Sequence, residues 1–401
     1  MAAVRRCGEL NGWPLHTAGQ DGALLAGALE ANFPSVDIPK ECGAPAPKIT
    51  GGFDEWIKAN PHMESQAYNE VKKCSCGKPC AVTMALCNAC GASLQEVEVS
   101  KSPNLFVAFI YGVDKASFPL RISMRLETKD MMVFDDPLAI TRAHVLAVPT
   151  NVYCPDIRSL FVDPARAVAL LKKMEAAAWT GLQQGPLASE VWRRKALSPE
   201  GNAMHIDALR DHVVMAFNLP PSQYQLHLQY MLPPLLPSHL GVFRKGAHFM
   251  KMRHFPLAYV LQALEKLALL GESWPDAPQL TAQELVDKIT PLGIDYGKAH
   301  DDDMMRLQKS NDLLANYDPA DFTHAVKGDE VTDKHTRTKV EGVTAKDLDG
   351  KDKLVLQGYG RPYEGGKPGG VYYMYPRDPE PLPTLSTSSA CCDAIFCGAA
   401  A

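Results

Sequence analysis

A succession of short apolar runs separated by turn residues constrains the fold of this chain more than any other feature. The runs NLFVAFIYGV, FPLRISMRLET, DMMVFDDP and AHVLAVPT follow one another between residues 104 and 150. Their apolar, β-branched or alternating composition predicts the strands of an antiparallel meander. A long helical pattern, VDPARAVALLKKMEAAAWTGLQQ, comes next, with Asp163 as its N-cap and Pro164 in its first turn. Strands followed by packing helices indicate an α+β fold, an antiparallel sheet with flanking helices.

Charge and hydropathy exclude several classes of protein. Charged residues make up 22% of the chain and the net charge is −5, so this is not a globally basic nucleic-acid-binding protein. The sequence holds no run of about 18 apolar residues, so we expect no membrane-spanning helix and no membrane partner. The start, MAAVRRCGEL, lacks the apolar block of a secretory signal. We expect an intracellular, reducing compartment, with the cytoplasm favoured and import into an organelle left open.

Clustered cysteines predict a metal site. Five of the eleven cysteines lie between Cys74 and Cys90, whereas a disulfide framework would spread them along the chain. A structural zinc ion takes four thiolates in a tetrahedron, and we expect Cys74, Cys76, Cys87 and Cys90, with Cys80 as the alternative upstream ligand. Four thiolates leave no position for water, so this zinc stabilises a small ribbon and takes no part in catalysis. The ribbon is also a candidate surface for an RNA or protein partner.

A polar face on an apolar strand is the second unusual feature. In SQYQLHLQYMLPP, which starts at Ser222, a period of two places Gln225, His227 and Gln229 on one face. Buried polar groups need partners. His227 alone fits a satisfied core residue, a metal ligand or a nucleophile. An imidazole can split a phosphoryl or nucleotidyl transfer into two easier steps, and the side chains of Ser222, Gln223 and Gln229 can donate to phosphate oxygens.

The same run resembles the signature strand of the histidine-triad superfamily. It is closest to the branch that contains diadenosine polyphosphate phosphorylases and galactose-1-phosphate uridylyltransferases, which carries a Ser-Gln pair followed by His-x-His-x-Gln. The resemblance implies that His227 is the nucleophile, that Gln229 assists catalysis, and that Ser222 and Gln223 form the pair. The position of the first histidine holds Gln225, which departs from the family pattern. An amide at Gln225 can hold His227 in one tautomer but cannot carry a proton.

A second, upstream segment strengthens the resemblance. MVFDDPLAITRAHVLAVPTNVYCPDIRSL looks like the strand-turn-strand that opens the nucleotide pocket in this superfamily, with matching positions at Phe134, Asp136, His144 and Pro149. By the family pattern, apolar residues there surround the base, acidic groups meet the ribose, and Asn218 meets phosphate. The two motifs are about 80 residues apart in the expected order, which makes the match more specific than either motif alone.

These patterns lead to two hypotheses about function. The first is a nucleotidyl transferase, phosphorylase or hydrolase that acts on a dinucleoside polyphosphate or a nucleotide sugar through a covalent nucleotidyl-histidine and requires no catalytic metal. The second is a catalytically degenerate nucleotide- or RNA-binding module whose zinc ribbon binds a partner. A homodimer paired through sheet edges is compatible with both.

Two further segments invite an interpretation. FRKGAHFMKMRHF contains a set of cationic and imidazole side chains that fits either a phosphate-contacting loop or a solvated loop: Arg244, Lys245, His248, Lys251, Arg253 and His254. HDDD, His300 to Asp303, resembles a metal-ligand cluster, but a helix start with carboxylates in its first turn explains it better.

The expected organisation has five segments. Residues 1–70 form an N-terminal extension, 71–96 the zinc ribbon, 101–275 the nucleotide-binding domain, 276–325 a helical extension, and 326–401 a polar, largely irregular and mobile tail.

Overall fold

The structure, a computed structural model, describes most of the chain between Phe53 and Leu385. The described residues are 53–75, 77–87, 92–111, 124–128, 130–136, 139–244, 246, 248–317, 325–327, 330–332, 339–340 and 381–385. The predicted zinc ligands Cys76 and Cys90 and most of the two terminal segments lie outside them.

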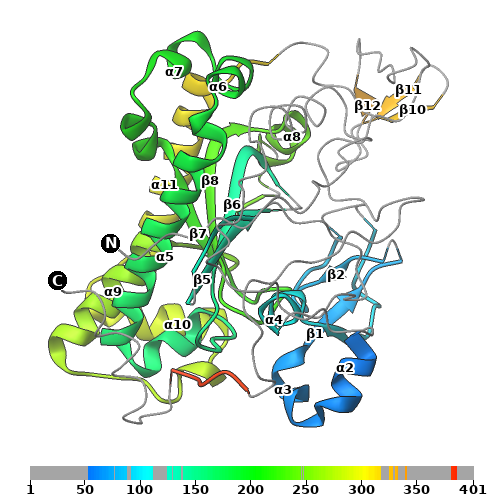
Figure 1. Cartoon of the computed structure of the whole chain (residues 1–401), viewed down its shortest axis with the longest axis vertical. Coiled ribbons are helices and arrows are strands. Elements are labelled where there is room, and N and C mark those ends of the chain that lie inside the picture. Colours follow the sequence, from blue (N-terminus) through cyan, green and yellow to red (C-terminus); the bar gives the residue numbers. More distant parts are fainter. Residues whose placement is uncertain are drawn as a thin grey trace, which may run out of the picture.

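A six-stranded antiparallel sheet forms the centre of the molecule (Figure 1). Its strand order is β4–β5–β6–β8–β7–β9. The strands are β4 (Met124–Glu127), β5 (Met131–Asp135), β6 (Thr141–Pro149), β7 (Val214–Asn218), β8 (Leu228–Leu235) and β9 (His254–Pro256). Together with the helices around it, this sheet confirms the predicted α+β class.

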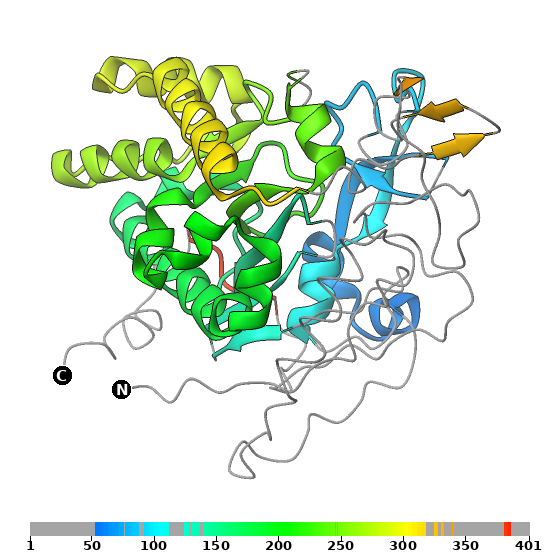
Figure 2. The ribbon, with the colours of Figure 1, turned by 90° about the horizontal axis from the view of Figure 1, so that it is seen from above.

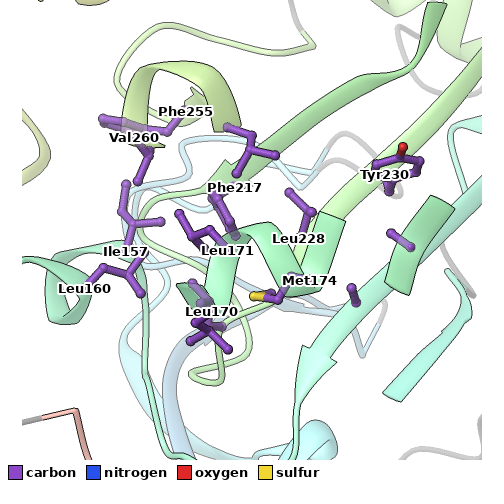
Figure 3. Packing of buried hydrophobic residues seen from close by; sticks show 14 of the residues in the cluster. Ile157, Leu160, Leu170, Leu171, Met174, Phe217, Leu228, Tyr230, Phe255 and Val260 are labelled. Atoms are coloured by element: carbon purple, nitrogen blue, oxygen red, sulfur yellow. The ribbon is translucent and has the colours of Figure 1, made fainter. Parts of the chain in front are cut away.

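Helices α5 (Pro164–Gln184) and α9 (Leu257–Leu270) belong to the larger core, which forms on one face of the sheet. Figure 3 shows this packing, in which Leu171 and Met174 of α5 lie beside Phe217 of β7 and Leu228 of β8. The predicted N-cap of α5 is confirmed. The Asp163 side chain accepts a hydrogen bond from the backbone of Arg166, and Gly271 ends α9 in the left-handed conformation with φ +67°.

The other face of the sheet is covered at one end by α4 (Leu105–Tyr111), all seven of whose residues are buried. This corrects the prediction of a strand for NLFVAFIYGV. A continuous apolar run of this length does not distinguish a buried strand from a buried helix. Here Asn104 caps the helix by accepting the Val107 N–H at 3.3 Å, and Gln223 accepts the Leu105 N–H at 2.8 Å.

The N-terminal part of the described chain packs against α4. Helices α2 (Phe53–Ala59) and α3 (Glu64–Ala67) lead into a small antiparallel sheet in the order β2 (Pro79–Cys80), β1 (Tyr68–Lys73) and β3 (Val99–Pro103). Figures 1 and 2 place this unit on the opposite side of the sheet from α9.

Residues 381–385 tie the N-terminal unit to the main body. The Gln66 side chain exchanges two hydrogen bonds with the backbone of Leu382, at 2.9 and 3.0 Å. The Tyr153 N–H donates to the Pro383 carbonyl at 2.8 Å, and Leu385 joins the larger core. This short part of the predicted tail is therefore packed.

The remaining helices lie around the sheet. They are α6 (Glu190–Ala196), α7 (Pro199–Ala203), α8 (Pro237–Arg244), α10 (Ala282–Ile289) and α11 (Tyr296–Leu314). A third small sheet contains β10 (Ala325–Lys327), β11 (Glu330–Thr332) and β12 (Lys339–Val340). Among the described residues, no helix is both long and apolar enough to cross a membrane.

Two other expected elements differ in the structure. The segment HIDALRDHVVMAF, whose sequence pattern predicts one helix, splits into a 3₁₀ helix, Ile206–His212, and strand β7. The helix expected to start at HDDD begins at Tyr296, where the Asp295 side chain accepts from the Lys298 N–H. HDDD thus lies inside α11, and His300 and Asp303 are buried.

Candidate active site

A pocket opens on the sheet face opposite to the larger core, with an empty volume of about 1020 Å³ that includes open solvent. Its floor comes from β6, β7 and β8, which supply His144, Asn218 and Gln229. The loop before β8 adds Ser222 and His227. The pocket therefore brings together residues that are far apart in the sequence.

Two further segments form the other walls. One is the small unit of β1, β2 and β3, termed the ribbon unit after the predicted zinc ribbon, and the other is the loop between α8 and β9. Residues 78–81 and Met84 of the ribbon unit contribute one side. The loop between α8 and β9 contributes a mixed set of aromatic, apolar and cationic side chains, His248, Phe249, Met250 and Arg253, and β9 adds His254.

His227 is oriented by its own loop. Its Nδ1 atom lies 2.8 Å from the backbone carbonyl oxygen of Gln225. A carbonyl only accepts, so Nδ1 carries the proton and a neutral ring has its lone pair on Nε2. Burial lowers the pKa of His227 below its ordinary value, which favours this neutral form. The Phe106 ring contacts the imidazole edge to face, with centroids 4.9 Å apart.

His144 and Gln229 form a second oriented pair. The His144 Nε2 atom lies 2.7 Å from Oε1 of Gln229, and His144 Nδ1 accepts the Ile140 N–H at 3.3 Å. The backbone donor assigns the proton to Nε2, so the Gln229 oxygen accepts and its NH₂ group is the end left to meet a ligand. Asp136 Oδ2 is 3.4 Å from the same Nε2. Burial lowers the pKa of His144, which keeps this imidazole neutral.

Gln225, for which the family resemblance also implies a nucleotide- or phosphate-binding role, is not among the residues that line the pocket. Its side chain is fully buried, and its oxygen accepts the Cys154 N–H at 3.2 Å. Its NH₂ group donates to the carbonyls of Pro149 and Val152 at 2.7 and 2.9 Å. The predicted alternation of side chains on a strand does not apply to Gln225, because β8 begins only at Leu228. The side-chain amide of Gln225 stabilises the turn before β8, and its backbone carbonyl orients the ring of His227.

Gln223 and Phe134 are also placed outside the pocket lining. The Gln223 oxygen accepts from the Asn69 side chain at 3.0 Å and from the Leu105 N–H. It thereby links β1 and α4 to the histidine loop. Phe134 is fully buried between the rings of Phe106 and Phe109. Its ring packs against α4, and its contact with a base stays a prediction.

The loop before β9, for which the sequence left a phosphate-contacting and a solvated interpretation open, contributes to the pocket lining. Arg253 lines the pocket, and within the described chain its guanidinium meets the Pro220 carbonyl at 3.4 Å and no carboxylate. Burial lowers the pKa of Arg253. Such a cation favours an anionic ligand, since an unpaired buried charge is costly.

Helix α11 holds this loop in place. The loop contains two residues with left-handed backbone, Phe249 with φ 56° and Met252 with φ 62°. His300 Nε2 donates to the Phe249 carbonyl at 2.6 Å, and the Tyr296 hydroxyl accepts from the Met252 N–H at 2.9 Å. Strained backbone of this kind persists only where the surroundings impose it.

Comparisons with known proteins were made for the whole chain. The sequence matches no family model and no curated protein. Two solved structures are similar: Hnt3 in complex with DNA and guanosine (15% identity, TM-score 0.25) and the aprataxin ortholog Hnt3 in complex with DNA (17% identity, TM-score 0.23). Each alignment covers 47% of this chain and 90% of the other. At these TM-scores the superpositions are too loose to support an argument about fold or function.

The described cysteines of the ribbon unit converge. Cys74, Cys80 and Cys87 share one small buried cluster, and the thiols of Cys80 and Cys87 are in hydrogen-bonding contact. None of the three forms a disulfide. Within the described residues no group of three His, Cys, Asp or Glu side chains has the arrangement of a metal site. Thiolate is the donor type that a structural zinc takes, and Cys80 is buried in the same cluster as the predicted ligands Cys74 and Cys87.

Proposed function

We propose that this protein is a nucleotide-processing enzyme of the histidine-triad type, in which His227 forms a covalent nucleotidyl-histidine. The observation that carries the proposal is the state of one ring. His227 is neutral, its Nδ1–H is held by a carbonyl, and it lines an open pocket. The lining also includes amide, hydroxyl and cationic side chains, from Asn218, Ser222 and Arg253, which suit the phosphates of a nucleotide.

In the first half-reaction, the Nε2 lone pair of His227 attacks the α-phosphorus. The N–P bond forms while the bond from phosphorus to the leaving phosphate oxygen breaks, and the electron pair leaves with that oxygen. Positive charge develops on the imidazole, where the Gln225 carbonyl accepts Nδ1–H and stabilises it. Ser222, Asn218 and the NH₂ group of Gln229 are placed to donate to the non-bridging oxygens.

The substrate is a dinucleoside polyphosphate or a nucleotide sugar, because both present an α-phosphorus with a phosphate leaving group. Arg253 supplies the positive charge for the outer phosphates. In the second half-reaction an acceptor, which is phosphate, a sugar phosphate or water, takes the nucleotidyl group from His227.

Zinc in the ribbon has a structural part in this proposal. Cys74, Cys80 and Cys87 would hold it with a fourth thiolate. When bound, the metal supplies folding free energy to a unit too small to form a large core. Because residues 78–81 line the pocket, the ribbon forms a wall of the nucleotide site.

A second candidate function is a nucleotide- or RNA-end-binding module without catalysis. The observation in its favour is Gln225, whose buried amide occupies the position of a family histidine and carries no proton to a leaving group. Lys78 and Arg253 in the walls suit a phosphate backbone as well as a polyphosphate.

A covalent-labelling experiment tests the enzyme. The protein is incubated with α-³²P-labelled diadenosine tetraphosphate or nucleotide sugar, denatured in alkali, and assayed for acid-labile label. We expect label on the wild type and on His205→Ala, whose imidazole is exposed, and none on His227→Ala. Saturable nucleotide binding without label on the wild type would instead support the binding module.

A further inference from the structure

The pocket wall contains a buried imidazole–carboxylate pair outside the histidine strand. His254 Nε2 lies 2.8 Å from Oδ2 of Asp303, and both side chains are almost completely buried. His254 belongs to β9 and lines the pocket, whereas Asp303 belongs to α11. Burying such a pair costs desolvation free energy that packing alone does not require, so its position beside the pocket calls for an explanation.

Strand pairing places this pair beside Asn218, and the pocket brings both to the nucleophile. Asn218 of β7 is the direct partner of His254. His227 lies in the turn just before β8 and lines the same pocket as Asn218 and His254. The three side chains share a face, because Phe217 and its partner Phe255 point into the opposite core (Figure 3).

The spacing that results suits a reacting phosphorus. Neighbouring strands lie about 4.8 Å apart, so the backbones at His254 and its partner Asn218 are separated by about that distance. A phosphoryl group held at Asn218 therefore lies beside His254, in the pocket that His227 also lines.

The state of His254 matches that of a general base. Asp303 accepts the proton of Nε2, so a neutral ring carries its lone pair on Nδ1. In the described chain no hydrogen bond engages that Nδ1 atom. The ring is packed against Phe249 and His300, with centroids 5.1 and 5.8 Å away.

The other imidazole on the floor of the pocket, His144, has both ring nitrogens in hydrogen bonds. One nitrogen bonds to Gln229 and the other accepts the Ile140 N–H. Gln225 has no titratable group and does not reach the pocket. A proton released by an acceptor in this pocket thus finds in His254 an imidazole with an open nitrogen.

We propose that His254, positioned by Asp303, is the general base of the second half-reaction, an inference that rests on the proposed function of His227. The acceptor hydroxyl gives its proton to His254 Nδ1 as its oxygen attacks phosphorus. The new O–P bond forms, the P–N bond to His227 breaks, and its electron pair returns to Nε2. The protonated His254 then loses its proton to solvent. An acceptor that must lose a proton needs a base, whereas an ionised phosphate oxygen does not, so a general base at His254 favours water as the acceptor and hydrolysis as the reaction.

A rapid-quench experiment separates the half-reactions. Wild type, His254→Gln, Asp303→Asn and the control His205→Gln are mixed with α-³²P-labelled diadenosine tetraphosphate, and formation and decay of protein-bound label are followed. We expect His254→Gln to form label within about threefold of the wild-type rate but to lose it at least 100-fold more slowly, since general-base catalysis contributes about 10²–10⁴-fold. Asp303→Asn should slow decay about tenfold or more.

A second variant separates a chemical role from a structural one. His254→Gly leaves a space for added imidazole, which should restore the decay rate at least tenfold without changing label formation. Thermal unfolding of each variant shows whether it is folded, and if His254→Gln is not, imidazole rescue of His254→Gly decides.

Three results would overturn the proposal. If label decays at the wild-type rate in both His254 variants, the His254–Asp303 pair is not the general base, and His227 remains the nucleophile. Loss of label formation in folded His254→Gln assigns the residue to the first step instead. Absence of label on the wild type overturns both the proposed function and the general-base role of His254.

Discussion

The Nδ1 atom of His227 lies 2.8 Å from the backbone carbonyl oxygen of Gln225, while the side chain of Gln225 bonds to three other backbone groups. One residue therefore has two tasks. Its amide fixes the turn before β8, and its carbonyl fixes the tautomer of the imidazole that follows. A side-chain histidine at this position is not needed for the second task.

The substitution Gln225→Ala should destabilise the protein, because it leaves the Cys154 N–H and the carbonyls of Pro149 and Val152 buried without this partner. We expect a loss of about 2–4 kcal/mol in the free energy of unfolding, measured by urea denaturation. Gln229→Ala, at a partly exposed pocket position, should cost less than about 1 kcal/mol. Equal stability of the two variants would contradict the buried role of Gln225.

His144 should act through Gln229 and not directly on substrate. In His144→Phe the Gln229 amide loses the donor that orients its oxygen, so it can turn that oxygen toward phosphate. We expect kcat to fall about 10–100-fold with KM changed less than about threefold. The double variant with Gln229→Ala should be no slower than Gln229→Ala alone. Additive losses would show that His144 acts independently of Gln229.

Local sequence signals predicted the parts of the fold that long periodic segments determine. Helix α5 follows from its stripe of apolar residues with Asp163 and Pro164 at its start. The apolar run of α4 was misassigned because a segment buried on all sides has no period to read. Tertiary packing against Phe134 and the caps from Asn104 and Gln223 favour the helix.

The candidate site was only partly predictable from the sequence for a related reason. His227, Gln229, Asn218 and Ser222 lie in or beside one strand motif, and the pocket contains all four. Arg253 and the His254–Asp303 pair depend on strand β9 and helix α11, which no local pattern places beside that motif. The signal that was available was the basic, aromatic composition of FRKGAHFMKMRHF, which fitted two interpretations equally.

Three buried imidazoles should make stability depend on pH. Burial lowers the pKa values of His144, His227 and His254 below 6.5 in the folded state. Protonation therefore favours the unfolded chain, so the stability of these neutral rings is complete above pH 6.5 and is lost as pH falls from there through the folded pKa values. Each group contributes up to about 1.4 kcal/mol per pH unit.

Urea denaturation between pH 7.5 and pH 5 checks this expectation. His227→Gln should give a shallower fall than the wild type, because one of the three titrating groups is gone. His205→Gln, at an exposed position, should leave the slope unchanged. Identical slopes for wild type and His227→Gln would mean that His227 titrates alike in both states.

The ribbon cysteines offer a test of which thiols hold zinc. Cys80 lies in the same buried cluster as Cys74 and Cys87 and contacts the Cys87 thiol, so Cys80→Ser should remove most of the metal. Cys76→Ser should retain it if Cys80 is the upstream partner of Cys74. Metal content by mass spectrometry of the purified proteins distinguishes the two variants.

Nucleotide binding should follow the metal, because residues 78–81 form a wall of the pocket. Loss of zinc should make residues 78–81 more mobile, so the ligand must order them when it binds. We therefore expect Cys80→Ser to weaken nucleotide binding about tenfold or more in a titration. Cys154→Ala is the matched control, as Cys154 is buried in the larger core and away from the ribbon. It should keep both its metal and its affinity. A Cys80→Ser protein without zinc but with unchanged affinity would show that the wall holds its shape without the metal.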